Sequence, residues 1–274
     1  MKSQIQKFPN AFKYVLAIIL FACALITSVF INKAPIKEYF PFTAVILLTF
    51  ATWYLYKKEN KTLSSLGLIL KRKNIFFLPL GIIVGASVFL TAKYLRTIYL
   101  GETFHLSESF NLKNILFALY TILPTVAVEE LIFRGYLFKK TIEISSVVKA
   151  NIIFAILFML IHVLDEGVLS NPGMIILLVI TIPVGHLLFA TALLKSKSLF
   201  FPIGIHLGNN WATRHLVSTN NNGESIFYIS NNVSFDTWPS FILFILLWNS
   251  IFLLAIFTIW KWNDFLFLNR RKKE

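Results

Sequence analysis

Cysteine and charge are what this chain of 274 residues has least of. Its one cysteine, Cys23, excludes an internal disulfide and any metal site built from cysteines. Charged residues make up 14% of the chain and hydrophobic residues 57%, whereas soluble domains are roughly 25% charged. The composition therefore argues against a soluble globular domain.

Acidic residues are also scarce relative to basic ones. The chain has 13 Asp and Glu against 26 Lys and Arg, which gives a formal net charge of +13. In a soluble protein this excess would suggest nucleic acid as a partner. Here the basic residues flank apolar runs, so we interpret them as orienting the chain in a lipid bilayer and expect no nucleic-acid partner.

Long apolar runs separated by short polar clusters are what the sequence does have. They predict an all-α, polytopic membrane helix bundle with about eight transmembrane helices. The first run resembles a signal-peptide core, but "LITSVFINK" is a weak cleavage site, so we expect the run to be retained. The predicted spans are 14–31, 40–56, 75–95, 114–137, 148–163, 174–194, 199–215 and 239–260.

The distribution of basic residues predicts the orientation of these spans. With a cytoplasmic N-terminus, and with basic residues at span ends counted in the adjoining segments, 19 of the 26 Lys and Arg residues lie in cytoplasmic segments and six lie outside. Only Arg134 lies in the interior of a span. The positive-inside rule then predicts a multi-pass protein of the cell membrane with both termini cytoplasmic. Gly81 and Gly85, in "GIIVG", form a pair of small residues suited to close helix packing.

Ionisable residues inside the spans are costly in a bilayer and usually functional. Glu130 and Arg134 are one helical turn apart, which favours an ion pair. Glu129 lies about 100° around the helix, so its carboxylate is left free to act as a general base. The complete set is Glu129, Glu130, Arg134, His162, His186 and His206.

Two further helices each contribute a pair of residues one turn apart that includes a histidine. Phe158 and His162 are one turn apart in "FMLIH", and His206 and Asn210 are one turn apart in "HLGNN". Converging side chains would suit water activation, with Glu129 as base, a histidine as proton donor or water positioner, and Asn210 as oxyanion donor. A zinc ion held by Glu129, His162 and His206 fits the same residues. A purely structural role in helix packing is the competing interpretation.

These three motifs resemble those of a known family. "EELIFRG", "FMLIH" and "HLGNN" match the EExxxR, FxxxH and HxxxN motifs of the type II CAAX prenyl protease and bacteriocin-processing family, called CPBP or Abi. The motifs occur in family order, and the resemblance covers roughly residues 115–215. It implies an intramembrane endopeptidase, of the glutamic type rather than the metallo type, with no cofactor; Zn²⁺ is the alternative. The implied roles are water activation by Glu129, assistance by His162 and His206, oxyanion support by Asn210, and support of the motif helix by Glu130, Arg134 and Phe158.

The resemblance also implies a membrane-associated protein or peptide as substrate, with a bacterial role in peptide maturation, bacteriocin immunity or signalling. It divides one integral membrane domain into N-terminal helices with an interfacial segment (1–110), catalytic core helices (111–215), and an outside loop, last helix and basic tail (216–274). A non-proteolytic scaffold or immunity protein with the same fold is the main alternative. A transporter with Glu129 and Glu130 as a proton relay is a weaker one.

Three ionisable residues lie outside the motifs. We expect His186 to have a packing or supporting role, and Asp165 and Glu166 to be solvated loop residues that could otherwise orient His162. Counting along the helices places His162 ~8–10 Å away from the level of Glu129 and His206 in the bilayer. The predicted site therefore requires helix tilt.

Overall fold

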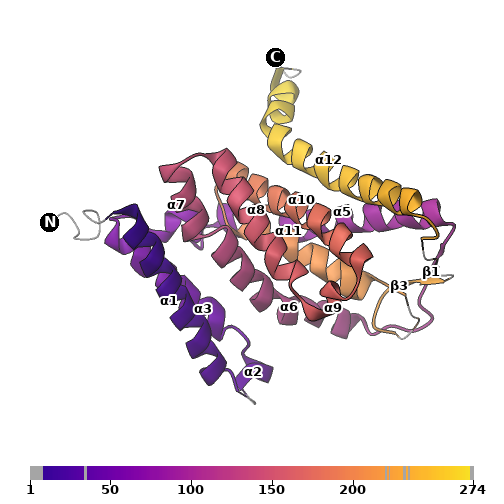
Figure 1. The fold of residues 1–274 in the computed structure, drawn as a ribbon, viewed down its shortest axis with the longest axis horizontal. Coiled ribbons are helices and arrows are strands. Elements are labelled where there is room, and N and C mark those ends of the chain that lie inside the picture. The colour runs from indigo at the N-terminus through magenta and orange to yellow at the C-terminus, as the bar shows by residue number, and fades with distance from the viewer. Residues whose placement is uncertain are drawn as a thin grey trace.

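The computed structural model is a helical bundle with one small sheet, and it describes residues 9–33, 36–219, 221, 223–230, 233 and 235–271 (Figure 1). The strands are β1 (Thr103–Leu106), β2 (Val217–Ser218) and β3 (Phe227–Ser230). A 3₁₀ turn covers Leu63–Leu66 and a π-helical turn covers Ala212–Leu216. The helices are α1 (Asn10–Ile31), α2 (Ile36–Tyr39), α3 (Thr43–Lys58), α4 (Arg72–Ile75), α5 (Phe77–Leu100), α6 (Leu112–Phe133), α7 (Tyr136–Ile144), α8 (Val147–Val163), α9 (Glu166–Leu169), α10 (Pro172–Ser196), α11 (Phe200–Trp211) and α12 (Trp238–Arg271).

Every predicted apolar run coincides with helix, so an all-α membrane bundle fits, but a count of eight spans is not confirmed. Within the described ranges, five helical segments are long and apolar enough to cross a membrane. Three predicted spans correspond to shorter helices, α3 with 16 residues, α8 with 17 and α11 with 12. The qualifying segments are Asn10–Ile31, Arg72–Leu100, Leu112–Ile144, Pro172–Ser196 and Trp238–Trp262.

Helix α11 is short because it lies inside the protein rather than in lipid. All eight residues 201–208 are buried, so the helix is covered on every side. The chain then leaves α11 through the π-helical turn and enters β2. A buried, apolar helix therefore has the composition of a membrane span without the length of one.

The loops of the bundle gather at two opposite ends. At one end β1 pairs with β3, antiparallel, with Thr103 opposite Ser230, and the sheet has the order β1-β3-β2. At the other end the Leu199 amide donates to the Leu66 carbonyl at 2.8 Å, and Lys61 pairs with Glu143.

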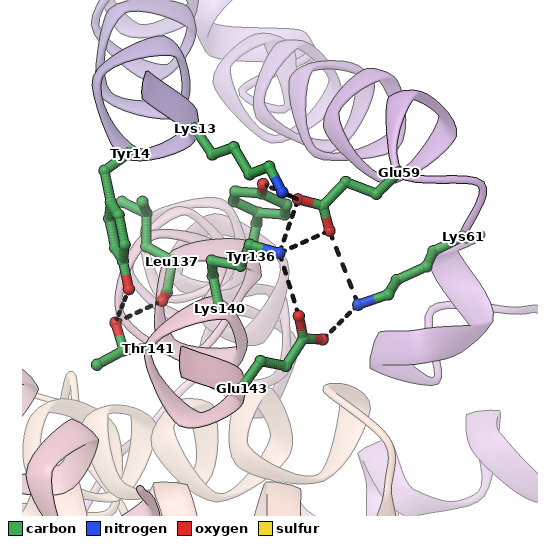
Figure 2. Close-up of polar contacts among 9 residues, drawn as sticks. All are labelled: Lys13, Tyr14, Glu59, Lys61, Tyr136, Leu137, Lys140, Thr141 and Glu143. Atoms are coloured by element: carbon green, nitrogen blue, oxygen red, sulfur yellow. Dashed lines mark hydrogen bonds and ion pairs between the residues drawn. The ribbon is translucent and has the colours of Figure 1, made fainter. Parts of the chain in front are cut away.

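A polar cluster joins the N-terminal helices to the rest of the bundle at the second end (Figure 2). Glu59, buried at the end of α3, accepts hydrogen bonds from Tyr136 Oη and Lys140 Nζ of α7, both at 2.9 Å. Lys13 Nζ of α1 and Lys61 Nζ lie 3.8 and 3.7 Å from the same carboxylate. One buried glutamate thus links α1, α3 and α7, and α1 and α3 lie side by side along one edge of the molecule (Figure 1).

Glycines bring the backbones of α5 and α11 into direct contact. A Cβ atom at Gly81 would lie 2.8 Å from the Cα of Gly204, and one at Gly85 would lie 3.0 Å from the Asn209 amide nitrogen. Gly208 likewise faces the backbone of α5. Contacts advance in the same direction along both helices, so α5 and α11 run parallel. The predicted small-residue pair at 81 and 85 therefore meets a second pair, at 204 and 208.

We expect Gly85→Ala to destabilise the protein by about 1–3 kcal/mol, because the added methyl group meets rigid backbone rather than a flexible side chain. The control is Gly185→Ala on α10, where a Cβ atom meets nothing within 4 Å and alanine favours the helix. The measurement is the melting temperature of each purified variant in the same detergent. Equal melting temperatures for the two variants would contradict the close packing of α5 and α11.

Candidate active site

The first motif lies at a break between two helices and not within one continuous span of 114–137. Helix α6 ends at Phe133, Arg134 is its C-cap residue, and Gly135 precedes α7. A Cβ atom at Gly135 would collide with the backbone carbonyl of Leu131, so the sharp turn requires glycine there. The predicted span 114–137 gave no sign of this break, because the residues on both sides of the turn are apolar.

Glu130 and Arg134 form a fully buried ion pair. Arg134 Nη1 donates to Glu130 Oε1 at 3.1 Å, and neither side chain is exposed. The guanidinium carbon lies 4.1 Å from the ring centroid of Phe158 and 4.9 Å from that of Phe189. Aromatic rings attract a cation through their electron-rich faces. The motif residue Phe158 therefore packs against the charge of Arg134.

His206 on α11 joins both glutamates. Its Nδ1 lies 2.9 Å from Glu130 Oε1, and its Nε2 lies 3.8 Å from Glu129 Oε2. The ring stacks on Phe189, with centroids 4.7 Å apart and planes at 17°. Because the ionised carboxylate only accepts, Nδ1 carries the proton and donates to Glu130. Glu130 thus orients His206 and directs Nε2 towards Glu129.

Glu129 keeps the unpaired carboxylate that the helix geometry predicts. Its side chain is 23% exposed, and Oε2 has no hydrogen-bond partner within the described part of the protein. The 3.8 Å separation from His206 Nε2 is too long for a direct hydrogen bond. A single water molecule bridging the two atoms would suit this distance.

His162 lies near the end of α8 with one ring nitrogen already engaged. Its Nδ1 lies 2.7 Å from the carbonyl oxygen of Phe158, one turn earlier. A carbonyl only accepts, so Nδ1 donates and Nε2 is left with a free lone pair. The Phe158 ring packs edge-on against the imidazole at 4.6 Å. Phe158 therefore positions His162 as well as Arg134.

A cavity of about 560 Å³ brings the second and third motifs together. His162, His206, Asn209 and Asn210 all line it, so the level difference expected from helix rise does not keep the two histidines apart. Glu129 is not among the described residues that line the cavity. Its Oε2 lies 3.8 Å from Nε2 of His206, which does line the cavity. Aromatic residues of α5 and α12 form much of the wall: Phe89, Phe244, Trp248 and Phe252.

The other ionisable candidates lie outside this arrangement. His186 is fully buried, packs against the ring of Phe138 at 5.8 Å, and has no hydrogen-bond partner in the described chain. Asp165 caps α9 by accepting from the Gly167 amide at 2.9 Å, and Glu166 is exposed. Because the Phe158 carbonyl accepts from His162 Nδ1, neither acidic residue is needed to orient that nitrogen.

The residues proposed to hold zinc do not assemble as a ligand set. Among the residues that the structure describes, no group of three or more His, Cys, Asp or Glu side chains is arranged to hold a metal ion. Of the set Glu129, His162 and His206, the first and last approach to 3.8 Å. This arrangement therefore does not fit a three-ligand zinc site.

Sequence reasoning missed one relation within the site, the bond from His206 to Glu130. The two residues are 76 positions apart, and no periodicity links them. The spacing of Glu130 and Arg134 accounts for only one of the two partners of the carboxylate. The sequence pattern gives no signal that His206 is the second partner of Glu130.

Comparison with known proteins agrees with the motifs. Residues 111–212 match the family described as type II CAAX prenyl endopeptidase Rce1-like, and this segment contains all three motifs. No curated protein and no solved structure matches the chain. Over residues 111–212 the chain is therefore similar to the Rce1-like type II CAAX prenyl endopeptidases, which is consistent with the CPBP family and, at the level of the family, with a CAAX-type membrane protease.

Proposed function

We propose that the protein is an intramembrane endopeptidase that uses a glutamate-activated water to cleave a membrane-associated protein or peptide. The observation that carries the proposal is the orientation of His206. Its Nδ1 bonds to the buried Glu130 at 2.9 Å, and its Nε2 faces the unpaired Glu129 carboxylate at 3.8 Å. This is the geometry of a base and a positioning group around one water molecule.

In the proposed reaction, Glu129 removes one proton from a water molecule. The other hydrogen of this water forms a hydrogen bond to His206 Nε2. The water oxygen bonds to the carbonyl carbon of the substrate, and the negative charge moves to the carbonyl oxygen. The side-chain amide of Asn210 donates to that oxyanion. The proton taken by Glu129 passes to His162 Nε2, and as the carbon–nitrogen bond breaks His162 gives this proton to the leaving nitrogen.

The biological role that we propose is bacterial peptide maturation, bacteriocin immunity or signalling. An apolar cavity lined with aromatic side chains suits a substrate that approaches from a membrane. The five apolar helices support the same setting. We propose cytoplasmic N- and C-termini, on the distribution of Lys and Arg alone.

We expect His162→Ala to lower cleavage by about 10²–10⁴-fold, the usual contribution of a positioned acid or base. The change removes one hydrogen bond to the Phe158 carbonyl and one ring contact with Phe158 near the end of α8, so we expect the fold to be retained. The experiment compares membrane and secreted peptides from cells producing the wild type or the variant, where uncut substrate accumulates with the variant. His105→Ala, on exposed β1, is the matched control.

Two results would contradict the proposal. Identical peptide profiles for wild type and His162→Ala would instead support a non-proteolytic scaffold. Loss of cleavage on treatment with a metal chelator, restored by added zinc, would replace the glutamic type with a metallo type.

A further inference from the structure

We propose that a crevice between α1 and α8 binds one acyl chain of an anionic phospholipid, with the lipid headgroup at Lys149. The crevice has a volume of about 470 Å³, and its walls come from α1, α6, α7 and α8. Ligand-binding pockets are commonly about 300–1,000 Å³. It has no described lining residue in common with the candidate active-site cavity. The inference therefore concerns a second site and goes beyond the proposed function.

The crevice follows one face of α8 and is open along its rim. Lys149, Ile153 and Leu157 lie at intervals of one helical turn along it, and all three are exposed. Phe133 of α6 and Phe154 are buried and form its floor. The eight residues from Lys149 to Leu157 correspond to ~12 Å along the helix axis. One leaflet supplies ~15 Å, half of the hydrocarbon core of a bilayer. The groove therefore has the length to hold most of an acyl chain within one leaflet.

The polar groups in the walls of the crevice are already bonded to one another. Thr141 Oγ1 donates to the Leu137 carbonyl at 2.9 Å, and Tyr14 Oη donates to Thr141 Oγ1 at 2.7 Å (Figure 2). Ser145 Oγ donates to the Thr141 carbonyl at 2.7 Å. A peptide in the crevice would bury backbone amides and carbonyls with few partners, which is costly. A hydrocarbon chain carries no such groups, so the lining favours a lipid over a peptide.

Lys149 gives one end of the crevice a positive charge. It is the only charged side chain among the described residues that line the crevice. Glu143, the acidic residue nearest to it in sequence, is directed to the other side of α7, where it pairs with Lys61 and Lys140 (Figure 2). Lysines near the membrane surface attract anionic lipids. An exposed lysine at the end of an apolar groove therefore complements an anionic headgroup that is attached to an acyl chain.

The floor of the crevice also supports the candidate active site from behind. The Phe133 ring lies 4.9 Å from that of Phe158, between centroids, and its centroid lies 5.9 Å from the guanidinium carbon of Arg134. Phe158 in turn packs against His162 at 4.6 Å. An acyl chain in the crevice restricts the movement of Phe133 and, through it, of these residues. Binding of the lipid should therefore raise the cleavage rate, a consequence that rests on the proposed function.

Photolabelling in vesicles tests the site without relying on cleavage. The full chain is reconstituted in phosphatidylcholine vesicles that contain a minor fraction of phosphatidylglycerol, with a photoreactive diazirine in the acyl chain of one lipid or the other. Labelled peptides are identified by mass spectrometry. We expect phosphatidylglycerol to label the crevice residues of α1, α7 and α8 in preference to the lipid-facing surface of α12. Equal labelling of both surfaces by both lipids would show ordinary boundary lipid and overturn the site.

Two substitutions test the two ends of the crevice separately. Lys149→Gln should lower labelling of the crevice by phosphatidylglycerol about fivefold, the contribution typical of one lysine near anionic lipid. Lys149→Arg should retain it, because the charge is kept. Leu157→Trp should lower labelling by either lipid, because the larger ring fills the groove while Lys149 remains. Lys71→Gln, at an exposed lysine before α4 and outside the crevice lining, is the control.

Three further results would decide against the site or its coupling to cleavage. Wild-type labelling in both Lys149→Gln and Leu157→Trp overturns the site. A crevice that stays unlabelled while two copies cross-link through α1 or α8 assigns this surface to a second copy of the chain. Labelling of the crevice with equal cleavage rates in the presence and absence of phosphatidylglycerol overturns the coupling alone. Labelling without cleavage of any peptide in either lipid overturns the proposed function and leaves the lipid site supported.

Discussion

Glu129→Gln is expected to reduce peptide cleavage by about 10²–10⁴-fold without changing the stability of the protein. The substitution keeps the size of the side chain and removes only its basicity. Glu129 has no ion pair with Arg134, and its Oε2 is unpaired among the described residues, so the fold does not depend on its charge. The measurement is the single-turnover rate with a peptide that the wild-type protein cleaves, together with the melting temperature.

The matched control for this change is Glu166→Gln, an exposed carboxylate on α9, four residues after His162. It removes the same charge from an exposed position and should cleave at the wild-type rate. Wild-type activity in Glu129→Gln would show that another group activates the water. A large fall in melting temperature would show instead that Glu129 is part of the structural pair.

Breaking the Glu130–Arg134 pair is expected to have the largest effect on stability. Both side chains are fully buried and bonded at 3.1 Å. Removing one partner of a buried pair leaves the other charge uncompensated, which typically costs about 3–5 kcal/mol. We therefore expect Glu130→Leu and Arg134→Met each to lower the melting temperature strongly, as measured by thermal unfolding in detergent.

The double variant Glu130→Leu/Arg134→Met separates stability from chemistry. Replacing both members of a buried pair with apolar residues is often neutral, so a large part of the lost stability should return. Cleavage should not return, because His206 Nδ1 loses the acceptor that lies 2.9 Å away. A double variant with full activity would show that Glu130 does not orient His206.

The helices of this fold could be predicted from apolar runs, but their lengths in the bundle could not. Hydrophobicity reports burial and does not distinguish lipid from protein as the surrounding medium. Helix α11 therefore had the composition of a span, although it is buried among other helices and is 12 residues long. The break at Gly135 was concealed for a related reason, since both sides of it are apolar.

Within the site, sequence spacing predicts local pairs and fails for distant ones. The Glu130–Arg134 pair follows from one helical turn, whereas the bond between Glu130 and His206 depends on how α6 and α11 pack. Lys93 lies near the end of the predicted span 75–95, and the count of basic residues includes it among the outside residues. In the structure α5 continues to Leu100, so Lys93 lies within the helix and faces the cavity.

The parallel pairing of α5 and α11 also affects when the site can form during synthesis. Two adjacent parallel helices need a long connection, and here residues 101–199 separate them. The ribosome produces the chain from its N-terminus, so α5 enters the membrane well before α11 exists. Gly81 and Gly85 of α5 have no packing partner until α11 is synthesised, and α11 also carries His206 and Asn210. The nascent chain therefore acquires both residues only after about three quarters of its 274 residues have been translated, and the candidate active site is incomplete before then.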